Sequence, residues 1–530
     1  MTRVLCAAAL LACLPVMATG APRAAPVQVD GGQVQGEGVG ALTVYKGIPF
    51  AAPPVGALRW RAPGPVATWS GVRQAASFAP ACMQTGVSMP GETPPKVSED
   101  CLYLNIWTPA KRTGGRRAVM VFIHGGGFSN GSASMPLYWG DELARRNVIV
   151  VTFGYRLGPF GFLALPQLTA ESGGHGSGNY GLLDQIAALG WVKRNIAAFG
   201  GDPDRVAIFG QSAGSMSVSL LMATPLAKGL FQRAIGESGG VFEPLQLAPD
   251  WLLPGAERRG EAYAASLGVS SLADLRALPA GRLLDGKAPT ITHPVIDGFT
   301  LTASPFEIFS EGRQNDVPLL IGFNEAEARS LVDLSVVRAA TFDADIRSAF
   351  GPLPLALMAA YPHATDLQAK QARADFERDL RFGWDMWTWA RLQAATGSGS
   401  VYYYHFTQTP PFPPGSVYAG WGASHYAELW YSFGHLGQEP WAWMSDDRVL
   451  SKAMTTYWTN FAKTGDPNGP SVPTWPRFGK VRGQALYLGT PIAVGGAPDA
   501  NSLAVFDAVY ARVRGESKTQ ADSAVGEGGK

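Results

Sequence analysis

Short apolar runs rich in β-branched residues alternate along the chain with segments whose apolar residues recur at helical spacing. Runs of roughly four to eight such residues are typical of strands buried on both faces, and the helical segments suit the crossovers that parallel strands require. We therefore expect an α/β fold with a largely parallel sheet covered on both faces. The predicted strands are residues 118–123, 148–153, 206–209, 318–322, 401–406 and 485–488, and the clearest helices are 182–199 and 213–222.

Two longer stretches, residues 251–294 and 336–397, are rich in leucine and alanine and favour helices. No repeat, long linker or shift in composition separates them from the rest of the chain. We interpret them as insertions packed over one edge of the sheet, within a single domain of residues 21–514. Residues 515–530 are polar and glycine-rich, so we expect a flexible C-terminal tail.

The first twenty residues have the features of an export signal. Arg3 precedes an apolar run, residues 4–17, and small residues follow at Ala18 and Gly20, before Ala21. The run is too short for an ordinary transmembrane span. We therefore expect cleavage after residue 20 and a periplasmic or secreted protein. Anchoring as a lipoprotein through Cys13 is the less favoured alternative, because that cysteine lies very early.

Composition excludes several classes of protein. Of the 530 residues, 46% are apolar and only 16% charged, which rules out a disordered chain. The 43 Lys and Arg nearly balance the 42 Asp and Glu, so no basic surface for nucleic acid is expected. No later run reaches transmembrane length, and nothing in the sequence determines the oligomeric state.

The cysteine count fits an exported protein. Cys6 and Cys13 lie inside the predicted signal, which leaves Cys82 and Cys101 in the mature chain. An even number of cysteines in an oxidising compartment is consistent with a disulfide. Closing this short loop would contribute roughly 3 kcal/mol. A pair of free buried thiols is the alternative.

Residues 209–214, Phe-Gly-Gln-Ser-Ala-Gly, connect a predicted strand to a predicted helix. A Gly-x-Ser-x-Gly sequence in this context places the serine on a tight turn that lifts its hydroxyl clear of the sheet. The N-terminus of the helix directs free N–H groups at developing negative charge. Ser212 is therefore the candidate nucleophile.

A serine nucleophile needs a base and an orienting acid, which follow it in the chain order of α/β-hydrolases. Among the later histidines, His425 lies in a loop of small residues, His435 competes with it, and His405 fits a packed strand. Glu325 and Glu327 follow the predicted strand 318–322, and either carboxylate can hold an imidazole in the required tautomer. Their alternative role is to cap the next helix through its dipole.

Three consecutive glycines, residues 125–127, follow His124 and the predicted strand 118–123. Glycines allow the backbone to approach a substrate and to direct N–H groups at a tetrahedral oxyanion. Losing one such donor typically costs roughly 3–4 kcal/mol of transition-state stabilisation. A phosphate-binding loop is the rival interpretation, but no Lys-Ser/Thr pair follows the glycines.

With these motifs assembled, the chain resembles the type-B carboxylesterases, the family of cholinesterases and para-nitrobenzyl esterases. Two long segments carry the resemblance: residues 199–214, around Ser212, and residues 99–109, Glu-Asp-Cys-Leu-Tyr-Leu-Asn-Ile-Trp-Thr-Pro. The similarity extends from about residue 29 to residue 478. It implies an α/β-hydrolase fold: a mostly parallel mixed sheet flanked by helices, with helical insertions over the active site.

The resemblance also implies a role for individual residues. The triad would be Ser212, His425 and Glu327, the oxyanion donors Gly126, Gly127 and Ala213, and the disulfide Cys82–Cys101. Hydrolysis of small-molecule carboxylic esters through an acyl-enzyme, with no cofactor or metal, would follow.

The chain departs from the family pattern at three positions. Gln211 replaces a glutamate before the serine, Ser215 replaces a glycine, and Ala328 replaces the glycine after the acid. The last change keeps Glu325 as a second candidate acid. A catalytically silent, cholinesterase-like binding module is the alternative from another class. An amidase or polyester hydrolase would use the same triad, and the sequence does not identify the natural ester.

Overall fold

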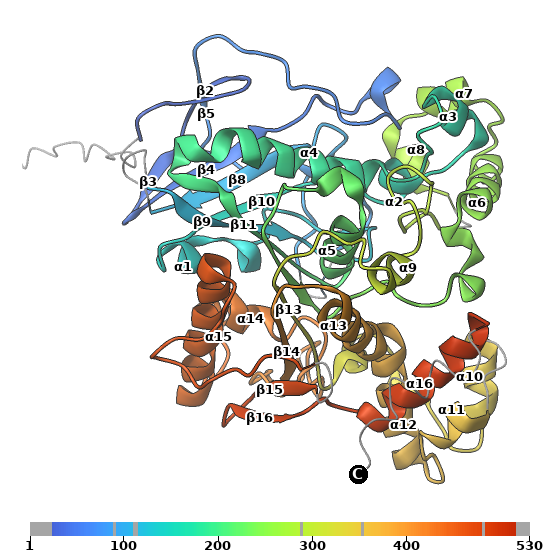
Figure 1. Cartoon of the computed structure of the whole chain (residues 1–530). Helices are drawn as coiled ribbons and strands as arrows, with labels where there is room; N and C mark the ends of the chain where they lie inside the picture. Colours follow the sequence, from blue (N-terminus) through green and yellow to red (C-terminus); the bar gives the residue numbers. More distant parts are fainter. Residues whose placement is uncertain are drawn as a thin grey trace, which may run out of the picture.

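Within the residues that the computed structural model describes, an eleven-stranded mixed sheet forms the centre of the molecule (Figure 1). The described residues are 24–87, 89, 92–109, 115–286, 290–350, 355–479 and 483–515. The strands follow one another across the sheet as β16 (Ala493–Gly496), β15 (Gln484–Leu488), β14 (Val401–Phe406), β13 (Leu319–Asn324), β12 (Arg233–Glu237), β11 (Gly201–Gln211), β9 (Arg117–Ile123), β10 (Ile149–Phe153), β8 (Tyr103–Thr108), β4 (Leu42–Pro49) and β3 (Glu37–Val39). From β15 to β10 neighbouring strands are parallel, whereas β16, β8, β4 and β3 pair antiparallel. The predicted α/β-hydrolase architecture is confirmed.

Alternate residues of the central strands face opposite sides of the sheet. In β9, Val119, Val121 and Ile123 belong to one hydrophobic core, whereas Met120 and Phe122 belong to the other. All five are at most 1% exposed. Because both faces are dry, the strand forms an uninterrupted apolar run in the sequence.

Helices cover both faces of the sheet (Figure 1). On one face lie α4 (Tyr180–Asn195), α5 (Ala213–Ala223) and α13 (Trp384–Thr396). On the other face lie α1 (Asp141–Ala144) and α15 (Ser445–Thr464). The sheet thus has a separate core on each side.

All six predicted strands are present, and the boundaries of β11 differ most from the prediction. The sequence predicts residues 206–209, but β11 begins at Gly201, and its register against β9 shifts between Gly201 and Val206. Strand β12 was not predicted because Arg233 and Glu237 close its ends and a glycine interrupts the short apolar core. Nevertheless β12 is fully inside the sheet, between β11 and β13.

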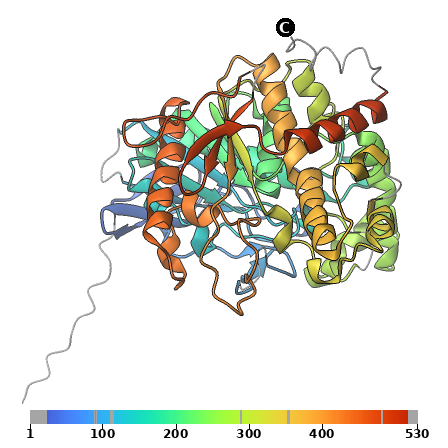
Figure 2. The same cartoon turned by 90° about the horizontal axis from the view of Figure 1, so that it is seen from below.

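The helical insertions lie differently from the prediction. The first contains α6 (Leu253–Ser266), and the second contains α12 (Asp366–Arg378) and α13. Helix α13 packs on the face of the sheet against β13 and β14 rather than over an edge. Figure 2 shows this second group of helices and the red helix α16 (Ala500–Val513) gathered on the side of the molecule away from α15.

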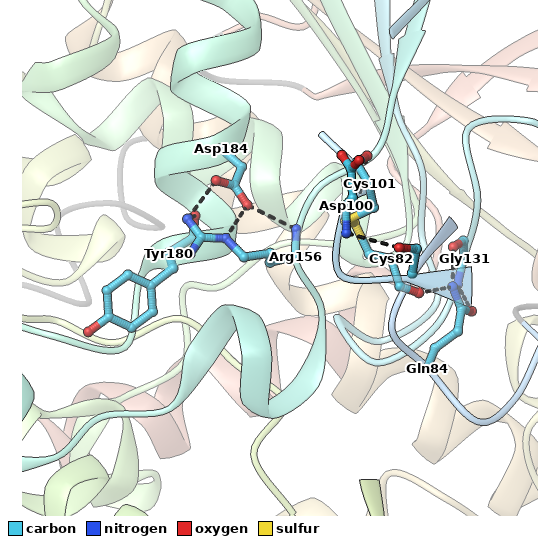
Figure 3. The surroundings of a disulfide bond; sticks show 9 residues. Cys82, Gln84, Asp100, Cys101, Gly131, Arg156, Tyr180 and Asp184 are labelled. Carbon is cyan, nitrogen blue, oxygen red and sulfur yellow. Dashed lines mark hydrogen bonds and ion pairs between the residues drawn. A yellow bond between two sulfur atoms is a disulfide. The ribbon is translucent and has the colours of Figure 1, made fainter. Parts of the chain in front are cut away.

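Cys82 and Cys101 form the predicted disulfide (Figure 3). Beside it, the Gln84 amide donates to the carbonyl of Gly131, and the Gly131 N–H donates back to Gln84 Oε1, both at 2.8 Å. These bonds join the disulfide loop to the segment that follows the three glycines.

The predicted signal, residues 1–20, and all but the first residue of the predicted tail, residues 515–530, lie outside the described residues. Over the described ranges, every helix is too short or too polar to cross a bilayer.

Candidate active site

Ser212 occupies the sharp turn between β11 and α5. Its backbone has φ 58° and ψ −126°, a conformation that costs a non-glycine residue on the order of 1–3 kcal/mol. The Ser212 N–H donates to the carbonyl of Glu237 in β12 at 2.8 Å, which fixes the turn. A Cβ at Gly214 would lie 1.9 Å from the carbonyl oxygen of Ile123, and one at Gly210 would lie 2.5 Å from Gly214. The two glycines of the motif are therefore required by close backbone contact.

The His425 ring is held from two sides. Its Nδ1 lies 2.6 Å from Glu327 Oε2, and its face stacks on the ring of Phe382 with centroids 4.5 Å apart. His425 is 3% exposed. This arrangement places the Nδ1 proton on the Glu327 side and leaves Nε2 available as an acceptor.

The structure brings Glu327, and not Glu325, to His425. Glu327 is fully buried, and its Oε1 accepts the backbone N–H of Asn324 at 2.7 Å. Glu325 is exposed, although its N–H donates to the carbonyl of Phe406 at 2.9 Å. Side chains two positions apart at the end of β13 thus point into different surroundings.

The two competing histidines are engaged elsewhere. His405, in β14, is buried against Phe323, and burial lowers its pKa to about 3. His435 lies 3.0 Å from Asp141 through Nε2 and 2.9 Å from the carbonyl oxygen of Leu137 through Nδ1. Neither contact involves Ser212.

Among the described residues no hydrogen bond joins Ser212 to His425 directly, but the chain neighbours of each make contacts with the other. Gln211 Nε2, from the residue before the serine, lies 3.3 Å from His425 Nε2. The Tyr426 hydroxyl, from the residue after the histidine, has a hydrogen-bond interaction with the Ser212 side chain. Hydrogen bonds between catalytic groups are often long in unliganded enzymes and shorten when substrate binds.

The glycine segment approaches Ser212 closely. A Cβ at Gly125 would lie 3.0 Å from the Ser212 Cβ and 2.7 Å from the carbonyl oxygen of Gln211. Gly126 and Gly127 have φ of 103° and 59°, and within the described ranges the N–H groups of both residues donate no hydrogen bond. Ala213 is the first residue of α5, where helical N–H groups have no intrahelical partner.

His124 supports this segment from behind. Its ring stacks on Tyr155 at 4.5 Å, and the Tyr155 hydroxyl donates to the His124 carbonyl at 2.8 Å. Burial lowers the pKa of His124 to about 4, so the imidazole is neutral at pH 7.

Two further buried carboxyl groups lie near Glu327. Burial raises the pKa of Glu237 to about 8. It also raises that of Glu428, which the charges of Glu327 and Glu237 raise further. The Asn324 amide donates to both Glu428 and the carbonyl of Ser424. Over the described ranges, no group of three His, Cys, Asp or Glu side chains is arranged to hold a metal ion.

Comparison with known proteins gives the family. The model of the "Carboxylesterase family" matches residues 23–506. The chain belongs to the carboxylesterase family. Among its relatives, a para-nitrobenzyl esterase of Bacillus subtilis is 36% identical over 88% of this chain and 95% of its own. A fumonisin B1 esterase of Sphingopyxis macrogoltabida is 36% identical over 87% of this chain and 86% of its own.

Solved structures agree with this assignment. A thermophilic para-nitrobenzyl (PNB) esterase superposes with a TM-score of 0.79 at 34% identity, covering 90% of this chain and 99% of its own. A carboxylesterase of Geobacillus stearothermophilus gives 0.78, with 34% identity and 90% and 98% coverage. The resemblance predicted from the sequence is confirmed, and the protein is a carboxylic ester hydrolase.

Three residues of this carboxylesterase that contact the candidate triad were not predicted from the sequence. Phe382 stacks on His425, Asn324 holds Glu327, and Tyr426 reaches Ser212. Asn324 and Tyr426 lie close to the candidate residues in sequence, so proximity alone was an available signal. Phe382 lies on a single π-helical turn, Asp379–Gly383, and only the folded chain brings it to His425.

Proposed function

We propose that the carboxylesterase cleaves esters through an acyl-enzyme formed on Ser212, with His425 as general base and Glu327 as the orienting acid. One observation carries this assignment: His425, buried 2.6 Å from Glu327, contacts Gln211, the residue that directly precedes a serine held in a strained turn.

In the proposed reaction, Ser212 Oγ attacks the carbonyl carbon of the ester while His425 Nε2 takes the hydroxyl proton. The tetrahedral intermediate collapses, its bond to the alcohol oxygen breaks, and His425 returns the proton to the departing alcohol. Water then attacks the acyl-enzyme by the same relay and releases the acid. Glu327 stabilises the imidazolium in both halves of the reaction.

The N–H groups of Gly126, Gly127 and Ala213 are the proposed oxyanion donors. Among the described residues the N–H groups of the two glycines donate no hydrogen bond, which supports this role, as does the position of Ala213 at the start of α5. Donors fixed before the reaction need no reorganisation as charge develops, and each typically contributes roughly 10²–10³-fold to kcat.

Replacement of Ser212 tests the proposal. We expect Ser212→Ala to lower kcat on 4-nitrophenyl butyrate at least roughly 10⁴-fold and to abolish labelling by a fluorophosphonate probe. The matched control is Ser219→Ala, on the same helix, whose hydroxyl bonds the carbonyl of Met216 and which should label normally. Full hydrolysis by Ser212→Ala would refute the nucleophile. Absence of labelling in the unmodified protein would favour the silent binding module.

We also propose that the protein is exported, to the periplasm or the medium. The apolar run 4–17 and the small residues before Ala21 support this, and the Cys82–Cys101 disulfide suits an oxidising compartment. Fractionation of a bacterial host and the intact mass of the product test it. A mature chain beginning at Ala21 is expected, whereas one beginning at Cys13 would indicate a lipoprotein. Unprocessed protein in the cytoplasm would contradict export.

A further inference from the structure

Tyr426 has a backbone conformation that tyrosine rarely adopts. It follows His425 directly, and its φ of 73° lies in the left-handed region that favours glycine. Such a residue costs on the order of 1–3 kcal/mol and persists only where its surroundings hold it. Here the Ala427 N–H donates to the carbonyl of Ser424, and the Leu429 N–H donates to the carbonyl of Tyr426, both at 3.0 Å. Backbone outliers of this kind cluster at functional sites, so the strained position of Tyr426 is consistent with a function for its side chain.

The side chain of Tyr426 is buried beside both candidate catalytic groups. Its ring lies 4.4 Å from the His425 ring, with the planes at 60°, and the residue is 7% exposed. Its hydroxyl has a hydrogen-bond interaction with the Ser212 side chain. Burial raises the pKa of Tyr426 above its ordinary value of 10.0, so the hydroxyl keeps its proton at neutral pH and can donate it to a hydrogen bond.

The position of this hydroxyl indicates which substrate atom it would meet. The glycine segment approaches Ser212 at Gly125, so a carbonyl oxygen bound by Gly126 and Gly127 lies on that side of the serine. The alkoxy oxygen is attached to the same carbon, and it must face the His425 loop because His425 protonates it. Tyr426 belongs to that loop, next to the histidine.

We propose that the Tyr426 hydroxyl donates a hydrogen bond to the alcohol oxygen that leaves as the acyl-enzyme forms. This role rests on the proposed function of Ser212 and His425. The bond between the carbonyl carbon and the alcohol oxygen breaks, and its electron pair stays on that oxygen. The proton comes from the His425 imidazolium, while Tyr426 keeps its own proton and stabilises the charge that develops before proton transfer is complete.

The proposal predicts a dependence on the leaving group. A 4-nitrophenolate ion is stable without help, whereas an alkoxide is strongly basic and needs both the proton and the hydrogen bond. We expect Tyr426→Phe to lower kcat/KM for ethyl butyrate by about 10- to 100-fold, the size of a lost hydrogen bond to a charged group. The loss for 4-nitrophenyl butyrate should be less than about threefold, with phenyl butyrate in between.

Two controls separate this role from loss of structure. Tyr457, in α15, donates its hydroxyl to the carbonyl of Pro473, and Tyr457→Phe should leave the rates on all three esters unchanged. Fluorophosphonate labelling, in which fluoride leaves, should proceed at a near-normal rate in Tyr426→Phe. Near-normal labelling shows that this variant is folded and that Ser212 is reactive.

Equal losses on all three esters would overturn the proposal, because they would mean that Tyr426 acts on Ser212 alone. No loss on any ester would overturn it as well. Failure of the triad itself would be seen separately, as full activity of Ser212→Ala on the same esters.

Discussion

Glu325 and Glu327 are two positions apart in sequence, but Glu325 is exposed and Glu327 is fully buried in the structure. Only Glu327 contacts His425, at 2.6 Å. We expect Glu327→Gln to lower kcat on 4-nitrophenyl butyrate by roughly 10³–10⁴-fold, because an amide in this position stabilises the wrong imidazole tautomer and no imidazolium. Glu325→Gln is the matched control and should change kcat less than about twofold. The opposite ranking of the two variants would assign the acid to Glu325.

For single residues, the local sequence identifies the candidate nucleophile more clearly than it identifies the candidate base and acid. The motif around Ser212 includes its own backbone requirement, since glycines are needed at 210 and 214 by contact within the turn and with Ile123. His425 and Glu327 were each one of several candidates, because an isolated histidine or glutamate has no comparable local signature. Their choice depends on burial and on contacts between segments almost 100 residues apart.

Strand β12 shows how an element can place a titrating group in the core. Glu237, its last residue, is fully buried, and its Oε1 accepts the indole N–H of Trp458 in α15 at 3.2 Å. Burial raises its pKa from 4.5 to about 8. Below pH 4.5 the folded and unfolded chains are both protonated at this site. Between pH 4.5 and about pH 8 only the unfolded chain loses this proton. The free energy of unfolding therefore falls as the pH rises, by on the order of 5 kcal/mol in total.

Removing this carboxyl should therefore flatten the pH profile of stability. We expect Glu237→Gln to gain stability relative to the unmodified protein between pH 5 and pH 9, seen as a growing difference in Tm by scanning calorimetry. Glu325→Gln, exposed and at the end of the next strand, should give no such trend. Parallel profiles for Glu237→Gln and the unmodified protein would show that Glu237 ionises normally.

The same strand shows why elements are predicted unevenly. Strands β9 and β14 have unbroken apolar or aromatic runs, apart from Arg117 at the start of β9 and His405 near the end of β14, and both were predicted within a residue of their ends. Strand β12 has a charged residue at each end and was missed, although its neighbours bury every residue of it except Arg233. Helix α13 was predicted, but its place on the sheet face was not, because many of its apolar residues contact other helices as well as strands. The spacing of apolar residues along the sequence indicates which face of an element is buried, but it does not identify the element that packs against that face.

At the scale of the molecule, one buried ion pair joins three distant segments. Arg156, after β10, forms two bonds of 2.7 Å to Asp184 in α4 (Figure 3). Its Nη1 also donates to the carbonyl of Arg61 at 2.9 Å. The two side chains are 4% and 0% exposed. Each charge has lost its hydration, and burial raises the pKa of Asp184 against the opposing effect of Arg156. Either charge would be unfavourable at this buried site without the other.

Removing one partner should therefore cost more than removing both. We expect Arg156→Met or Asp184→Asn alone to destabilise the fold by about 3–5 kcal/mol, since each leaves the other group buried without its counter-charge. The double variant Arg156→Met/Asp184→Leu should be more stable than either single variant, because a well-packed apolar pair carries no desolvation penalty. Urea unfolding followed by tryptophan fluorescence measures all three against the unmodified protein. Additive losses in the double variant would mean that the bonds to Arg61 and the local backbone, rather than charge pairing, hold these segments together.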